Sequence, residues 1–273
     1  MRQRIRSDSI DVIVAGHSIR LFYESSGEDE QTAVLQLHGW GSSAAHMRPI
    51  AEWLEGDCLV YNLDLPGHGQ SPPPPEAWGV PEHAELVRCV AERLIDGPYT
   101  VVGHSNGGRI ALYLASEESP PAYLARLALI GPSGIRRKRT VAFHLRRFAA
   151  AALKAPFALL PGTLRTFSLD WLRHSLIWRL LGSSDYRNLE GVMRDTFVKT
   201  VNCYLEERLP RIGIPVLLYR GDRDDSISAE QIAKMQALLP DAGLVIVEGA
   251  GHYAFLDRPD VVRASLRHFL AHS

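Results

Sequence analysis

The sequence has few cysteines and no long apolar run. Its three cysteines, Cys58, Cys89 and Cys203, are far apart and form no CxxC pair. A disulfide framework or a zinc knuckle would need a different pattern. The apolar stretches fall short of the roughly 18 residues of a transmembrane helix, and the first residues lack the apolar centre of a signal peptide. We therefore expect a cytoplasmic protein without a membrane span.

An excess of charge is lacking as well. Thirty Lys and Arg residues against 31 Asp and Glu leave a net charge of -1, which argues against nucleic acid as a partner. Hydrophobic residues make up 46% and charged residues 22%, the composition of a chain that folds around a core rather than one that stays disordered. A length of 273 residues fits one large domain or one domain with an insertion.

What the sequence does contain is a regular alternation of short apolar runs and segments with helical spacing. After an N-terminal hairpin, this alternation is typical of an α/β fold with a mostly parallel, doubly wound sheet covered on both faces. The alternation stops at Gly134 and resumes near Ile214. We therefore predict an α/β core of residues 1–134 and 212–273, with a helical cap, residues 135–211, inserted after the sixth strand.

A glycine-rich turn carries the strongest chemical signal. The segment Gly103-His104-Ser105-Asn106-Gly107 matches GxSxG and stands between a predicted strand, 99–102, and a predicted helix, 109–115. In this setting the turn is strained, small residues beside the serine relieve the strain, and its Oγ is held out at the end of the sheet. We therefore predict that Ser105 is a nucleophile.

A serine hydroxyl is a poor nucleophile until a neighbouring base takes its proton. His252 follows the last predicted strand, 244–247, in the turn EGAGH, and so stands at the same sheet edge as Ser105. The other histidines are less well placed, and His104 is expected to point away beneath the turn. His252 is therefore the predicted base.

The base in turn needs a carboxylate that fixes its tautomer. The strand IPVLLYRG runs directly into Asp222-Arg223-Asp224-Asp225, and no carboxylate follows the preceding strand in GPSGI. Asp224 is the preferred acid, because the first Asp often braces such a turn and the third tends to face solvent. Asp222 and Asp225 remain alternatives.

The negative oxygen of a tetrahedral intermediate requires two backbone donors. One is the amide of Asn106, the residue after the nucleophile, and the other is expected from the loop His38-Gly39-Trp40-Gly41, at the amide of Trp40. His38 itself is expected to be a structural hydrogen bonder. In DLPGHGQS, Asp64, Gly67, Gly69 and Ser71 are interpreted as a loop-forming set.

Together these motifs resemble the α/β-hydrolase family. HGWG, DLPGHGQS, GHSNGG, GDRD and GAGH occur in the family's order over most of the chain. The resemblance implies a triad of Ser105, Asp224 and His252, an oxyanion hole from the Trp40 and Asn106 amides, and no metal or organic cofactor. Asn106 departs from the Met or Leu that is common there in the family.

The resemblance is nearest to small carboxylesterases, including the pimeloyl-acyl-carrier-protein methyl ester esterases. It implies a serine hydrolase that cleaves a small-molecule carboxylic ester through an acyl-enzyme on Ser105. Two alternatives stay open. One is a carbon-carbon bond hydrolase of the meta-cleavage product type, and the other is a slow-turnover ligand receptor on the same fold.

The predicted cap has a charge of its own. Residues 135–211 hold 15 Lys and Arg against 6 Asp and Glu, which leaves the rest of the chain at -10. A basic cluster, Arg136 to Arg139, opens this region; it is interpreted as a solvated helix start or as a docking face for an acidic partner or an anionic substrate. The resemblance to the methyl ester esterases implies that such a partner is an acidic carrier protein. The apolar side chains of the cap are candidates for pocket walls: Phe143, Phe148, Phe157, Trp171 and Trp178.

Overall fold

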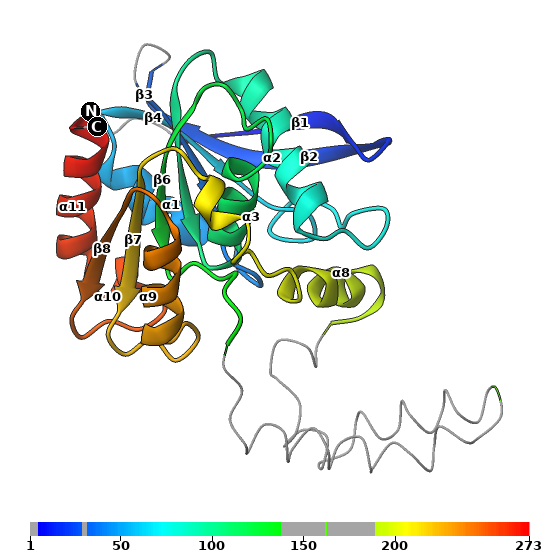
Figure 1. Cartoon of the computed structure of the whole chain (residues 1–273). Helices are drawn as coiled ribbons and strands as arrows, with labels where there is room; N and C mark the ends of the chain where they lie inside the picture. The colour runs from blue at the N-terminus through cyan, green and yellow to red at the C-terminus, as the bar shows by residue number, and fades with distance from the viewer. Residues whose placement is uncertain (1–4, 29–31, 138–161, 163–188, 273) are drawn as a thin grey trace.

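The protein is organised around one twisted sheet of eight strands (Figure 1). The computed structural model describes residues 5–28, 32–137, 162 and 189–272. The strands lie in the order β1-β2-β4-β3-β5-β6-β7-β8. Their bounds are β1 Arg6–Val14, β2 His17–Ser26, β3 Thr32–Leu37, β4 Cys58–Leu63, β5 Tyr99–His104, β6 Leu124–Ile130, β7 Val216–Gly221 and β8 Ala242–Val247.

The two N-terminal strands form the predicted hairpin. Ala15 and Gly16 turn the chain between β1 and β2 with φ of 50° and 79°, the left-handed pair that a tight hairpin requires. β2 pairs antiparallel with β4. From β4 onward the strands β4, β3, β5, β6, β7 and β8 run parallel to one another. The carboxyl ends of these parallel strands therefore meet at one edge of the sheet, the carboxyl edge.

Helices cover both faces of the sheet. Because successive side chains of a strand point to opposite faces, neighbours in one strand enter different cores. Val101 packs with the α2 and α3 side, and Val102 with the α1 and α11 side. Helices α1 Ala44–Trp53, α10 Ala254–Asp257 and α11 Pro259–Ala271 cover one face, and α2 Val80–Leu94, α3 Asn106–Ala115 and α9 Ala229–Leu238 the other. This is the predicted doubly wound, mostly parallel α/β sheet.

The described part of the predicted cap lies at its carboxyl end. It contains α8, Gly191–Val201, and a 3-10 turn, η1, Leu209–Arg211. The Leu205 amide donates to the Gly134 carbonyl at 2.8 Å, so the chain leaves the core and returns to it at adjacent points. Leu205 and Leu209 are fully buried in the main core. The predicted pocket-wall residues of the cap, together with Lys138 and Arg139, lie outside the described residues.

Two further findings concern the described ranges. No helix there combines the length and the apolar character required to cross a membrane. The three cysteines are unpaired, and Cys58 is buried.

Candidate active site

The predicted nucleophile occupies a strained position between β5 and α3. Ser105 has φ 51° and ψ -107°, a conformation that L-residues rarely adopt. A methyl group on Gly103 would lie 2.8 Å from the Gly108 Cα, and one on Gly107 would collide with the Leu37 carbonyl. The glycines around Ser105 are therefore required by close backbone packing beneath the turn.

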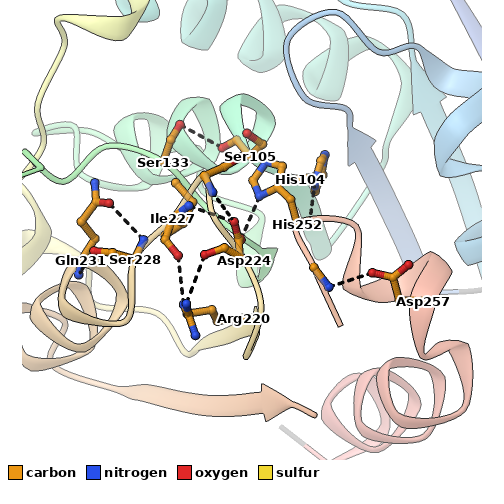
Figure 2. A network of polar contacts seen from close by, with 12 residues as sticks. His104, Ser105, Ser133, Arg220, Asp224, Ile227, Ser228, Gln231, His252 and Asp257 are labelled. Atoms are coloured by element: carbon orange, nitrogen blue, oxygen red, sulfur yellow. Dashed lines mark hydrogen bonds and ion pairs between the residues drawn. The ribbon is translucent and has the colours of Figure 1, made fainter. Parts of the chain in front are cut away.

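Backbone hydrogen bonds fix this turn against the neighbouring loop. The Ser105 amide donates to the Ile130 carbonyl at 3.0 Å. The Ser105 carbonyl accepts from the Arg109 amide at 3.2 Å and from the Ser133 amide and hydroxyl at 3.1 and 3.2 Å. Figure 2 shows Ser133 bonded to Ser105 in this way. Sequence reasoning missed Ser133, although the small residues after β6 were a signal of a tightly packed loop.

His252 and Asp224 form a hydrogen-bonded pair at the carboxyl edge of the sheet (Figure 2). Asp224 Oδ2 lies 2.9 Å from His252 Nδ1, and Asp224 Oδ1 accepts from the Ser226 and Ile227 amides at 2.8 and 2.9 Å. Burial alone would raise the pKa of Asp224, but the hydrogen bonds from His252, Ile227 and Ser226 outweigh it and lower the pKa. Asp224 is therefore held as a carboxylate. Of the three candidate acids, Asp224 contacts His252, while Asp222 and Asp225 are exposed.

The loop that carries Asp224 is braced from behind. Arg220 donates through Nε to the Ile227 carbonyl at 2.9 Å, and through Nη1 and Nη2 to the Asp222 and Asp224 carbonyls at 3.4 and 3.2 Å. Gly131, with φ 52°, closes the other side: a methyl group there would lie 3.0 Å from His252 Nδ1 and 3.2 Å from Asp224 Oδ2. The His-Asp pair is therefore fixed between two loops that follow β6 and β7.

His104 is expected to point away beneath the turn, but in the structure its ring lies against the loop that carries His252. Its Nε2 donates to the His252 carbonyl at 3.1 Å, and the two rings are 4.7 Å apart. Burial and the neighbouring His252 lower the pKa of His104 to about 3, so it is neutral at physiological pH. His104, which directly precedes Ser105, thus links the serine turn to the predicted base, His252.

The expected oxyanion loop also lies against Ser105. A methyl group on Gly39 would be 3.1 Å from the Ser105 Cβ, so only glycine allows this approach. Trp40 follows, and its ring packs 5.0 Å from His68 and 5.1 Å from Phe197 of α8. Asn106 begins α3 and is buried. The structure therefore brings the Trp40 loop and the start of α3 to the same turn.

The residues expected to have structural roles do have them. His38 accepts from the Leu65 amide through Nε2 at 3.0 Å and donates through Nδ1 to the Gly39 carbonyl at 2.7 Å. Burial lowers the pKa of His38 to about 3. Asp64 accepts from the Ala44 amide at 2.7 Å and from the Gln70 amide at 2.9 Å, which holds the DLPGHGQS loop in place.

In the part of the chain that the structure describes, no group of three or more His, Cys, Asp or Glu side chains is arranged to hold a metal. The described residues combine a strained serine turn with a histidine that is hydrogen-bonded to an ionised carboxylate, and these are the groups that nucleophilic hydrolysis by serine uses.

Comparisons with known proteins show which family of folds the chain matches. The family described as the alpha/beta hydrolase fold matches residues 32–259. The chain is 28% identical over 262 residues to the N-formylmaleamate deformylase of Pseudomonas putida, covering 95% of this chain and 96% of that protein. It is 25% identical over 255 residues to the pimeloyl-[acyl-carrier protein] methyl ester esterase of Neisseria meningitidis serogroup C, covering 89% and 94%.

A solved structure gives the same picture at the level of the fold. The crystal structure of a membrane phospholipase A matches with a TM-score of 0.71 and 25% sequence identity, covering 97% of this chain and 86% of that chain.

Proposed function

The chain belongs to the alpha/beta hydrolase fold family, and from that membership we propose that it is a serine hydrolase that cleaves a carboxylic ester through an acyl-enzyme on Ser105. The observation that carries the proposal is the 2.9 Å bond between Asp224 and His252 beside a serine held at φ 51°. Relatives named as an esterase and as a deformylase support hydrolysis as the type of reaction.

The order of proton transfers follows from the tautomer of His252. Ionised Asp224 accepts the Nδ1 proton, which leaves the Nε2 lone pair free to take the Ser105 proton. Ser105 Oγ then attacks the acyl carbon, and the negative charge moves to the former carbonyl oxygen. The imidazolium that forms is stabilised by Asp224.

The remaining steps use the same groups. The amides of Trp40 and Asn106 donate to the oxyanion, a contribution worth about 10² to 10³ in rate for each donor. The tetrahedral intermediate collapses and the alcohol leaves with the proton from His252. Water, deprotonated by His252, attacks the acyl-enzyme and releases the acid and free Ser105. No metal or organic cofactor takes part in this scheme.

Turnover of simple esters tests the proposal. Replacing Ser105 with Ala removes the nucleophile, and we expect at least a thousandfold loss of kcat for short 4-nitrophenyl esters with the fold retained. Ser119→Ala, at an exposed position between α3 and β6, is the matched control. A Ser105→Ala rate equal to that of the wild type would overturn the proposed nucleophile.

The two alternatives are separated in the same assay. A carbon-carbon hydrolase would turn over a vinylogous diketone ring-cleavage product faster than any ester. A slow receptor would react with a fluorophosphonate at Ser105 yet complete few turnovers. Preference for esters, with repeated turnover, is the result that the proposal requires.

A further inference from the structure

A group of buried polar atoms between α3 and α8 has no protein partner. In the described part of the chain, Asn106 Oδ1, Arg109 Nε and Thr200 Oγ1 are all buried without a hydrogen bond. The three residues are 6%, 7% and 1% exposed. Native proteins rarely leave such atoms unpaired, because each loses its bonds to water on burial and gains none in return.

These residues lie beside the proposed nucleophile. Asn106 and Arg109 are three apart on α3, so they share one face of the helix that Ser105 begins. The Arg109 side chain crosses to the end of α8, where Nη1 donates to the Thr200 carbonyl. A methyl group on Gly134 would lie 3.7 Å from Arg109 Cγ, which places this side chain under the point where the cap leaves the core.

Among the described residues, Arg109 is a buried cation without a paired carboxylate. Burial lowers its pKa to about 10, so the guanidinium is still protonated at neutral pH. No carboxylate of the described residues pairs with it. The carboxyl end of α8 supplies only the partial negative charge of a helix terminus. The burial of a cation without a full counter-charge is costly, and an anion that enters this position would relieve that cost.

A comparison with Arg220 shows what a structural arginine looks like in this protein. Arg220 is equally buried, at 8% exposure, and all three of its guanidinium nitrogens donate to backbone carbonyls. Arg109, within the described ranges, makes one hydrogen bond and has an unpaired Nε. The contact with α8 therefore uses Nη1 of Arg109 and leaves its Nε without an acceptor.

We propose that Arg109, Asn106 and Thr200 form a subsite that binds a carboxylate of the substrate. A guanidinium matches the planar carboxylate with two parallel N–H donors, and the Thr200 hydroxyl and Asn106 Nδ2 can add further donors. The unpaired Asn106 Oδ1 is an acceptor and is not itself a contact for the anion. This inference rests on the proposed ester hydrolysis.

The carboxylate can belong to the acyl part or to the alcohol part of the ester, and two matched substrate pairs distinguish these sources. The acyl pair is mono-4-nitrophenyl adipate against 4-nitrophenyl hexanoate. The alcohol pair is 2-carboxyethyl butanoate against propyl butanoate, followed by acid release in a pH-stat. We expect the wild type to prefer the charged member of one pair by about tenfold or more in kcat/KM.

The preference should depend on Arg109. In the Arg109→Met variant, the ratio of kcat/KM for the charged ester to kcat/KM for its neutral partner should fall towards one. Damage to the fold would instead lower kcat/KM for both esters together and leave this ratio unchanged. Thr200→Val removes an unpartnered hydroxyl and should lower the ratio severalfold. Arg208→Met is the control for lost charge, because Arg208 stacks 4.0 Å from the Tyr113 ring on the same helix and lies outside the cluster.

A binding measurement separates this subsite from the proposed reaction. Glutarate should raise the thermal midpoint of Ser105→Ala protein, glutaramide should not, and the Arg109→Met change should abolish the difference. Equal shifts for glutarate and glutaramide, or an ester preference unaffected by Arg109→Met, would overturn the subsite. Absence of turnover for all four esters would instead overturn the proposed hydrolysis, and the glutarate shift would still decide the subsite.

Discussion

At the scale of single residues, His104 occupies the point where the proposed catalytic loops meet. It precedes Ser105, donates to the His252 carbonyl at 3.1 Å, and its Nδ1 faces Gly39 of the oxyanion loop. Its ring also packs 4.6 Å from Tyr253. We therefore propose that His104 acts as a positioning residue for His252.

Two variants separate the ring of His104 from its donor. His104→Phe keeps a ring but loses the bond to the His252 carbonyl, so the base can shift relative to Ser105. We expect kcat to fall about tenfold to a hundredfold with KM unchanged, since displacements near 1 Å carry costs of this order. His104→Gln restores a donor and should recover most of kcat. Equal kcat losses in both variants, in proportion to their thermal destabilisation, would indicate a packing role alone.

The choice among the three aspartates shows where sequence reasoning reaches its limit. The edge of the sheet and the order of motifs indicate the segment Asp222 to Asp225, but neighbouring loop residues differ only in local backbone direction. In the structure Asp224 is 4% exposed and bonded to His252. The direction of His104 towards the base loop likewise depends on loop packing that no pattern in the sequence encodes.

At the scale of elements, α8 packs on the loops that surround Ser105. Phe197 lies 5.1 Å from Trp40, and the Met193 side chain fills the space above Gly67. Thr196 Oγ1 accepts from the Trp78 amide at 3.1 Å, and Lys199 Nζ donates to the Ala77 carbonyl at 2.6 Å. α8 therefore contacts the Trp40 loop through Phe197 and the segment of residues 67–78 through its other side chains, although it belongs to the predicted cap.

The Thr196 contact offers a test of this docking. Thr196→Val keeps the shape of the side chain but removes the acceptor of the buried Trp78 amide, which we expect to cost about 1–3 kcal/mol in the free energy of unfolding. Thr196→Ser keeps the hydroxyl and is the matched control. Chemical denaturation gives the free energies, and amide exchange at Trp78 shows whether the loss is local. Equal stabilities of the Val and Ser variants would mean that this bond does not stabilise α8.

Elements were predicted best where burial is complete. The central strands read as continuous apolar runs because helices cover both faces, and helices α2 and α11 keep a clear apolar stripe. Sequence reasoning missed α10, which has only four residues and no periodicity to detect. It did not single out α8 either, because most of its residues are exposed or half-buried and the apolar pattern is diluted.

At the scale of the whole molecule, charge divides between the core and the predicted cap. The excess of +9 in residues 135–211 makes an acidic carrier protein a partner worth testing at that surface. Among the described residues of the basic cluster, Arg136 stacks 4.5 Å from the Tyr204 ring and its amide donates to Glu206 at 2.8 Å. Arg136 is thus tied to the carboxyl-terminal part of the predicted cap, and docking of a carrier stays a prediction.

Buried histidines give the whole molecule a second electrostatic property. Burial lowers the pKa of His38 and of His104 to about 3, and it also lowers the pKa of fully buried His83. In the unfolded chain each titrates near 6.5. Between these values the unfolded state binds more protons than the folded state, so stability rises with pH and falls on acidification.

The size of this effect can be predicted and measured. Well below pH 6.5, His38 and His104 together should remove about 2.7 kcal/mol of unfolding free energy per pH unit, one proton each. Below about pH 4 the stabilisation from Asp224, whose pKa is lowered by folding, is lost as well. Urea unfolding at pH 7, 6 and 5 should therefore show a steepening loss, and His104→Gln should reduce the slope by one proton. If the slope of unfolding free energy against pH is the same in His104→Gln as in the wild type, the His104 ring takes up its proton in the folded state without unfolding.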